Sequence, residues 1–175
     1  MGQIITFKMI MQLLWIILEL SAIPLMLLII KYFIEYLIDT IRYNRLKSTG
    51  ILEIDQMSGR DFEIRLKILF NHLGYKVELK RGYKDHGADL ILIGSGGARV
   101  AVQAKKLSNR NGRVGAKVIG EALRGKQYYN CHYAMIITNQ YFTEQAIEEA
   151  KKTGVTLMDR NALLKYLEKE KGVSA

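Results

Sequence analysis

The sequence predicts an α/β sandwich with a mixed central sheet, preceded by one long apolar helix. Three observations lead to this fold class. A run at 9–30 is almost entirely apolar, whereas residues 48–175 alternate short apolar runs with longer amphipathic ones. The elements of this second part follow the order α-β-β-β-α-β-α-β-α, which is typical of helices packed around a sheet. The turn GSGG at 94–97 joins two apolar runs and suits a hairpin.

The first helix of the second part is predicted over 58–75. Its apolar residues recur at spacings of three and four. Ser58 can cap the amide of Asp61, and Gly74 ends the helix. The remaining elements are predicted from alternating apolar and polar residues, helix-capping residues and turn residues. They are strands at 76–80, 88–93 and 98–105, a helix at 116–129, a strand at 133–138, a helix at 143–154, a strand at 155–159 and a helix at 162–171.

Residues 1–47 are interpreted as a transmembrane anchor with a juxtamembrane linker, and residues 48–175 as one soluble domain. The apolar run 9–30 contains a single charge, Glu19. A helix of that length spans about 33 Å and matches a hydrocarbon core of ~30 Å, so membrane lipid is an expected partner. Glu19 would be protonated, paired in an oligomer such as a homodimer, or placed near an interface by a displaced span. A two-pass hairpin reaching residue 41 is the alternative to one span.

Basic residues flank the apolar run unequally. Lys8 precedes it, and four basic residues follow it, namely Lys31, Arg42, Arg45 and Lys47. The positive-inside rule then predicts a single-pass membrane protein whose C-terminal domain lies in the cytoplasm.

The chain carries a net charge of +9. The surplus is densest between Arg99 and Lys126, where eight basic residues meet one acid, Glu121. A field of that sign favours phosphate-rich partners or anionic lipid, and a solvated basic surface without a partner is the plainer alternative. The single cysteine, Cys131, excludes an internal disulfide and fits a reducing compartment.

Polar residues at the ends of two neighbouring predicted strands form the candidate site. Asp89 begins one strand, and Gln103 and Lys105 end the next, which returns beside it after a short turn. Alternate residues share a face of a strand, so Gln103 and Lys105 point the same way and meet Asp89 at one end of the sheet.

A carboxylate, an amide oxygen and an ammonium suit a Mg²⁺ ion and a water. Asp89 would bind the ion directly, with the Gln103 side-chain oxygen and the Ala104 carbonyl as further ligands. Lys105 would orient or help deprotonate the attacking water, or neutralise charge on a phosphate. Glu63, on the first helix of the domain, is a candidate further carboxylate.

Each of these residues also has a plainer explanation. An aspartate at a strand start is usually a cap or a loop contact, and a Gln-x-Lys at a strand end usually lies at a solvated edge. Glu63 also suits the positive end of a helix dipole. The joint spacing of Asp89, Gln103 and Lys105 is more specific than any one of them.

Several segments from 58 to about 164 carry a resemblance to a known family. They are FE in the first helix, LGYKVEL, DHGADLIL, VAVQAKK, VIGEALRGKQYYN and MIITNQYFTEQAIEEAKKTGVTLMD. Together they resemble the Mrr-like restriction endonuclease family within the PD-(D/E)xK nuclease superfamily. The resemblance implies a restriction-endonuclease-like fold and a D…QxK active site at Asp89, Gln103 and Lys105, with Glu63 as the helix glutamate.

The sequence departs from the superfamily pattern at two points. The middle position is commonly Glu or Asp, and the neutral Gln103 leaves one fewer charge for a metal. A membrane segment stands where family members often carry a DNA-recognition domain, so no target specificity is implied.

The resemblance implies a membrane-anchored, Mg²⁺-dependent DNA endonuclease that acts on double-stranded DNA, with defence against foreign DNA as one role. A non-catalytic, membrane-tethered DNA-binding or scaffolding module on the same fold is the alternative. The intact Asp89, Gln103 and Lys105 argue against that alternative. The residues expected to contact DNA phosphates are Arg110, Arg113, Lys117, Arg124 and Lys126.

Overall fold

The computed structural model describes residues 2–47, 49–80, 86–109 and 111–173. The chain divides into two compact units, Met1–Arg42 and Tyr43–Ala175, which are described separately. The boundary placed after residue 47 on sequence grounds stays a prediction.

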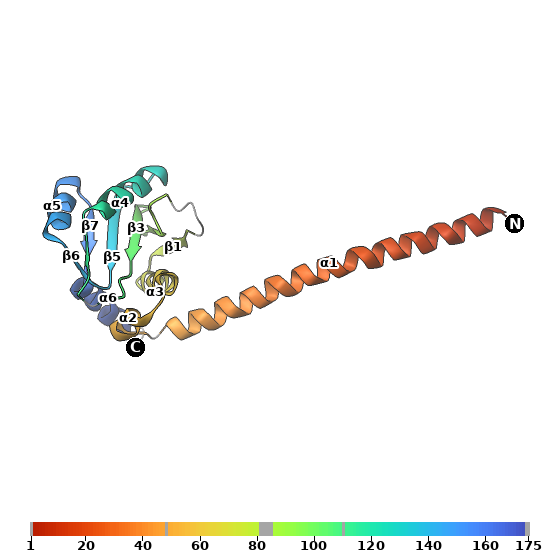
Figure 1. Cartoon of the computed structure of the whole chain (residues 1–175), viewed down its shortest axis with the longest axis horizontal. Helices are drawn as coiled ribbons and strands as arrows, with labels where there is room; N and C mark the ends of the chain where they lie inside the picture. Colours follow the sequence, from red (N-terminus) through yellow and green to blue (C-terminus); the bar gives the residue numbers. More distant parts are fainter. Residues whose placement is uncertain (1, 48, 81–85, 110, 174–175) are drawn as a thin grey trace. The chain divides into compact units, whose positions relative to one another are not determined.

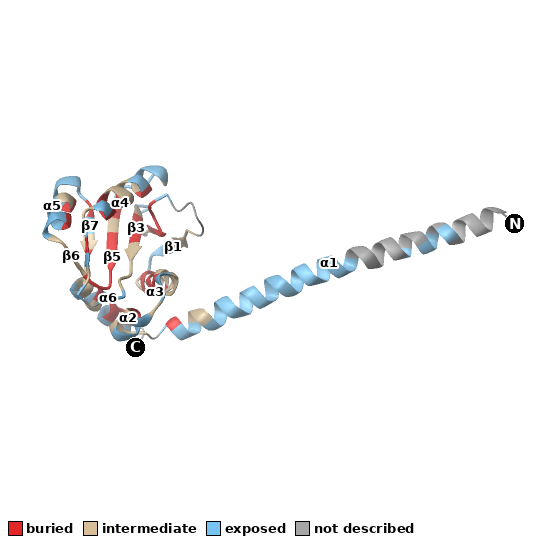
Figure 2. Ribbon diagram, in the orientation of Figure 1, coloured by how far each residue is buried: buried red, intermediate tan, exposed pale blue. Residues whose placement is uncertain are grey.

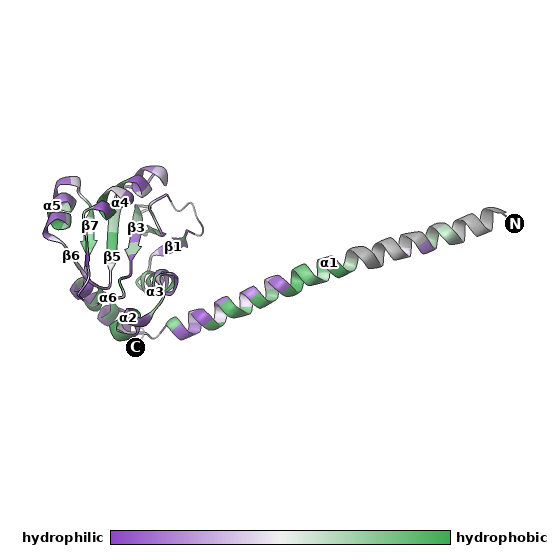
Figure 3. Ribbon diagram, viewed as in Figure 1, coloured by the Kyte–Doolittle hydropathy of each residue, from purple (hydrophilic) through white to green (hydrophobic). Residues whose placement is uncertain are grey.

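The first unit belongs to one continuous helix, α1 (Gly2–Leu46), with Pro24 inside it. No turn interrupts this helix, so the two-pass hairpin alternative is wrong for the described residues. The large apolar side chains described between Met9 and Ile41 are exposed (Figures 2 and 3). Within the described part of the chain, no helix combines the length and the hydropathy needed to cross a bilayer. The predicted span at 9–30 is therefore not supported here, and the Glu19 side chain lies outside the described residues.

The second unit is built on a five-stranded sheet with the order β1-β2-β3-β5-β7. The first three strands pair antiparallel, and β3, β5 and β7 pair parallel. The predicted mixed central sheet is thus confirmed. The bounds are Lys76–Leu79 for β1, Leu90–Ile93 for β2, Arg99–Lys105 for β3, Tyr133–Thr138 for β5 and Thr156–Met158 for β7.

Helices cover both faces of this sheet (Figure 1). Val102 of β3 shares an apolar core with α2 (Ile51–Gln56), α3 (Gly59–His72) and α6 (Arg160–Val173). Ile136 of β5 shares a second core with α4 (Lys117–Tyr128) and α5 (Glu144–Thr153) on the other face. Most of the middle residues of β3 and β5 are buried between these layers (Figure 2).

The local signals in the sequence form the expected contacts. The Ser58 hydroxyl accepts a hydrogen bond from the Asp61 amide at 3.0 Å and caps α3. Gly74 follows that helix with a φ of +88°, which favours glycine. In the hairpin between β2 and β3, the Gly94 amide donates to the Ala98 carbonyl at 3.0 Å.

Three short elements were not predicted from the sequence. One is α2, which has six residues and lies just after the predicted linker. The others are β4 (Arg113–Val114), inside a predicted loop, and its parallel partner β6 (Tyr141–Phe142). Elements of two or six residues are too short to show a hydrophobic period.

Candidate active site

Asp89 and Gln103 meet at the end of the sheet, as the sequence predicts. The register pairs Leu90 with Val102, so the residue before Leu90 lies opposite the residue after Val102. Both side chains are buried, with 7% of Asp89 and 5% of Gln103 exposed. The Gln103 side-chain amide donates a short hydrogen bond to Oδ2 of Asp89.

The same carboxylate oxygen is held by the backbone of β3. The Ala104 amide donates to Oδ2 of Asp89 at 2.7 Å. The side chain of Asp89, just before β2 begins, thus accepts a backbone hydrogen bond from β3. The N–H and C=O of one strand residue point toward the same neighbouring strand. The Ala104 carbonyl is therefore directed to the edge that Asp89 occupies, which places a second candidate ligand oxygen there.

Lys105 lies on the expected face of β3 and meets a residue that the site prediction did not include. Val102 and Ala104 pack in the core beside α3 and α6, so the alternate residue Lys105 faces α4. Its ammonium forms an ion pair of 2.7 Å with the Glu121 carboxylate of α4. The Lys105 side chain is 36% exposed and that of Glu121 is 22% exposed, so the pair is within reach of a solvent-borne ligand.

Two glycines allow α4 to lie directly against the loop that leads to Asp89. A Cβ added to Gly87 would stand 2.1 Å from the Glu121 carbonyl oxygen, and a Cβ added to Gly125 would stand 2.4 Å from the Gly87 carbonyl oxygen. Gly87 also has a φ of +90°. Backbone contact this close fixes the distance between the Asp89 strand and the helix that carries Glu121.

The chain beyond Lys105 is fastened by polar residues at the end of β5. The Thr138 hydroxyl donates to the Lys105 carbonyl at 2.7 Å. Asn139 accepts from the Leu107 amide at 2.8 Å and donates to the Leu107 carbonyl at 3.0 Å. Thr138 and Asn139 are fully buried and hold the end of β3 in place. Their sequence signal was the polar run TNQ, which begins at the last residue of a buried strand.

Glu63 lies on α3, the helix that covers the other face of the sheet. It forms an ion pair of 2.5 Å with Arg60, whose guanidinium also donates to the Lys80 carbonyl at 3.4 Å. The Lys80 amide in turn donates to the Asp89 carbonyl at 2.8 Å. Glu63 is thereby linked to the strand end that bears Asp89, and its part in the site stays a prediction.

The predicted phosphate-contacting residues do not all lie on one surface. Lys117 and Arg124 are exposed on α4 and, at helical spacing, share a stripe with Glu121. Lys126 is nine residues from Lys117, which is two and a half turns and places it on the opposite side of the helix. Arg113 is exposed on β4, and Arg110 lies outside the described residues.

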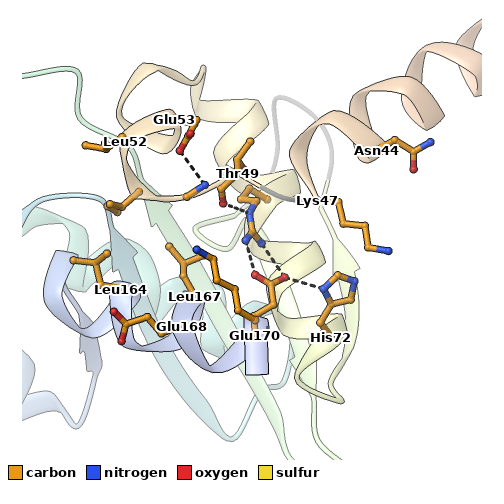
Figure 4. Close-up of a pocket in the computed structure, with 14 residues that line it drawn as sticks. Asn44, Lys47, Thr49, Leu52, Glu53, His72, Leu164, Leu167, Glu168 and Glu170 are labelled. Carbon is orange, nitrogen blue, oxygen red and sulfur yellow. Dashed lines mark hydrogen bonds and ion pairs between the residues drawn. The ribbon is translucent and has the colours of Figure 1, made fainter. Parts of the chain in front are cut away.

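A separate pocket of about 700 Å³ lies between α2, α3 and α6 (Figure 4). The residues of the predicted site do not line it. In its wall, the buried Arg65 donates to both oxygens of Glu170, at 3.2 and 2.5 Å, and to the Thr49 carbonyl at 3.1 Å. His72 contacts the same carboxylate at 2.8 Å. This network joins α3 to α6, so we interpret it as structural.

The candidate ligand atoms around Asp89 are all oxygens, which is the atom type that a hard divalent cation prefers. The candidates are the carboxylates of Asp89 and Glu121, the Gln103 side-chain oxygen and the Ala104 carbonyl. Gln103 turns its NH₂ group toward Asp89, which leaves its oxygen on the other side of the amide. Among the described residues, no group of three or more His, Cys, Asp or Glu side chains is arranged to hold a metal.

Comparison with solved structures supports the fold. The DNA modification-dependent restriction endonuclease AspBHI aligns with a TM-score of 0.54 and 19% identity, over 76% of this chain and 40% of that one. A protein of unknown function, AF1548, aligns with a TM-score of 0.51 and 18% identity, over 61% of this chain and 63% of that one. The chain thus spans less than two thirds of either structure. Likeness at such identities shows a shared restriction-endonuclease-like fold.

Comparison with protein families supports a closer relationship. Among curated proteins, none matches the chain. The restriction endonuclease family Mrr_cat matches residues 54–167, a range that contains Glu63, Asp89, Gln103, Lys105 and Glu121. Since this match covers well over half of the chain and includes the whole arrangement at the ends of β2 and β3, the chain belongs to the restriction endonuclease family.

Proposed function

We propose that the protein is a Mg²⁺-dependent DNA endonuclease that hydrolyses phosphodiester bonds. The observation that carries the proposal is the contact of Asp89 with Gln103 and the Ala104 amide, next to the Lys105–Glu121 ion pair. A buried carboxylate that can hold a divalent cation, with a positive charge beside it, can assist the hydrolysis of a phosphodiester. Membership of the restriction endonuclease family supports the same activity.

Each residue has a separate task in this proposal. Asp89, Gln103 and the Ala104 carbonyl would hold the metal, and the hydrogen bonds to Oδ2 keep the carboxylate in one orientation. The Lys105 ammonium would supply a positive charge that offsets the negative charge building on the phosphate. Glu121 positions that ammonium and can add an oxygen ligand. A bound Mg²⁺ would polarise the phosphate and assist the loss of a proton from the attacking water.

The direct test is cleavage of supercoiled plasmid by the full chain with and without added Mg²⁺. The proposal expects nicked and linear products with Mg²⁺, and none when EDTA is present. Intact plasmid in the presence of Mg²⁺, from a preparation that still binds DNA, would favour the alternative of a non-catalytic DNA-binding or scaffolding module.

We also propose, from the sequence, that residues 9–30 attach the protein to a membrane as a single span and leave the nuclease domain in the cytoplasm. The exposed apolar side chains of α1 support this proposal, because water is a poor solvent for so much apolar surface. Among the described residues of α1, hydropathy is highest in the middle part of the helix (Figure 3). The protein is expected to stay in the membrane fraction after carbonate washing, and its release by carbonate would contradict the anchor. A homodimer stays a prediction beside it.

A further inference from the structure

An exposed pair of stacked rings lies beside the candidate active site. The rings of His86 and Tyr128 stack with centroids 3.8 Å apart and an angle of 16° between their planes. Tyr128 is 61% exposed, and His86 is exposed as well. Exposed aromatic rings contribute little to a core, and the exposed surface of such a pair is suited to stacking against a planar ligand.

The backbone at His86 is held in an uncommon conformation. Its φ is +47°, in the left-handed region that residues other than glycine seldom adopt. Gly87 follows, pressed against the backbone of α4. The loop is therefore tied to the helix on which Tyr128 lies, and the His86 ring is presented to it. Such outliers persist where the surrounding structure determines them, frequently at functional sites.

The stacked rings lie close to the proposed chemistry. Asp89 is three residues from His86, so their Cα atoms are separated by at most about 11 Å. Tyr128 is seven residues from Glu121 on α4, which places both on one stripe of that helix. The stripe connects the ion pair of Lys105 to the stacked rings.

Positive charge accompanies the rings. Arg124 is exposed one turn before Tyr128 on the same stripe. The Lys80 ammonium lies 5.0 Å from the ring centroid of Tyr129, and that ring meets Tyr128 edge-on at 4.9 Å. Exposed aromatic rings next to basic side chains are the combination by which proteins bind unpaired nucleotides, through base stacking and phosphate contact.

We propose that His86 and Tyr128 form a stacking platform for an unpaired base, so that the preferred substrate is duplex DNA with unpaired bases beside the cut. This inference rests on the proposed function, since it names the class of DNA that the same site would take. A regular duplex keeps its bases stacked inside and offers the platform nothing to bind. A bulge, gap or flap supplies a free base face to the outer side of the rings.

The test compares two labelled DNAs that differ only in three unpaired bases at the centre of one strand. Fluorescence anisotropy measures the Kd of each with the full chain in detergent, in EDTA so that binding is separated from cleavage. One stacked base is worth about 5- to 140-fold in affinity, from ~1–3 kcal/mol per base. The wild-type chain is expected to prefer the bulged DNA by a factor in this range.

Three variants identify the source of that preference. Tyr128→Ala is expected to abolish it while changing the Kd for intact duplex less than about twofold. Tyr128→Phe keeps the ring and should retain the preference. Tyr133→Ala is the matched control, because Tyr133 is another exposed tyrosine, 58% accessible, at the start of β5. Circular dichroism verifies that each variant is folded.

A preference that survives in Tyr128→Ala, or that Tyr133→Ala loses equally, would overturn the inference, as would equal wild-type affinity for the two DNAs. The plasmid assay separates this failure from failure of the proposed function. A chain that cuts plasmid but binds both DNAs alike contradicts the platform alone. A chain that prefers bulged DNA through Tyr128 but never cuts contradicts the nuclease alone.

Discussion

Replacement of Gly87 by alanine should destabilise the domain at the contact between α4 and the loop that leads to Asp89. Two costs add at this position. A side chain at a φ of +90° costs about 1–2 kcal/mol because of the left-handed backbone. The new Cβ would also stand 2.1 Å from the Glu121 carbonyl oxygen, so the loop or α4 must move by more than 1 Å. Overpacking of this kind costs about 1–3 kcal/mol. The free energy of unfolding should therefore fall by about 2–5 kcal/mol.

Two matched variants separate these costs in urea unfolding followed by circular dichroism. Gly74→Ala meets a φ of +88° with open space around the new Cβ, so it should lose only the conformational term of about 1–2 kcal/mol. Gly125→Ala meets the overlap at 2.4 Å but gains about 1 kcal/mol of helix propensity, which leaves a net loss of about 0–2 kcal/mol. If Gly87→Ala were no more destabilising than Gly74→Ala, the close packing of the loop on α4 would be refuted.

Three further outcomes follow from the contacts. Glu170→Ala should lower the free energy of unfolding in urea by about 3–5 kcal/mol, because it leaves the buried charge of Arg65 without its carboxylate partner. The double variant Arg65→Met with Glu170→Met should lose less, and a double variant as unstable as Glu170→Ala would contradict this account. Lys117→Gln should reduce the salt dependence of duplex binding by about 0.9 in log–log slope for one phosphate contact, whereas Lys126→Gln, on the opposite side of α4, should leave the slope unchanged; equal slopes in both variants would remove Lys117 from the interface. Burial raises the pKa of the Cys131 thiol. Iodoacetamide should therefore modify this thiol more slowly in the native chain than in urea. Equal rates would show that the thiol is accessible and reactive in the native chain.

The sheet and the meeting of Asp89 with Gln103 could be predicted because they depend on short-range rules. A strand alternates its faces, and a four-residue turn returns it to a neighbour in a nearly fixed register. Those two rules alone bring the start of β2 opposite the end of β3. The caps at Ser58 and the ending at Gly74 are equally local.

The partner of Lys105 could not be predicted in the same way. The rotation of α4 about its own axis, relative to the sheet, depends on how its apolar residues pack and on the close approach at Gly87 and Gly125. Only that rotation decides that Glu121, and not a basic neighbour, faces Lys105. Its sequence signal was faint, a single acid in a basic run.

The basic residues show that charge density along a sequence does not by itself predict which side chains share a surface. Lys117 and Lys126 belong to one basic run, yet the helical period separates them by half a turn beyond two full turns. A prediction from the basic run alone places both lysines on one surface, whereas a helical projection places them on opposite sides of α4. The helix α2 and the ladder of β4 with β6 depend on tertiary contacts, because their own lengths carry no periodic signal.

The central claim is that Asp89 and Lys105 carry out phosphodiester hydrolysis in one site. Asp89→Asn keeps the size of the side chain but removes its charge, and Lys105→Ala removes the ammonium. The matched control is Lys126→Ala. It removes a lysine from the side of α4 opposite the stripe that carries Glu121.

Plasmid cleavage in Mg²⁺ by these variants, purified side by side, is the most direct measurement. The account predicts that Asp89→Asn and Lys105→Ala lose cleavage by at least about 100-fold while duplex binding and circular dichroism stay near wild type, and that the double variant loses no more than either single one. Lys126→Ala should cut as the wild type does. Cleavage at the wild-type rate in both Asp89→Asn and Lys105→Ala would contradict the assignment of the chemistry to these two residues.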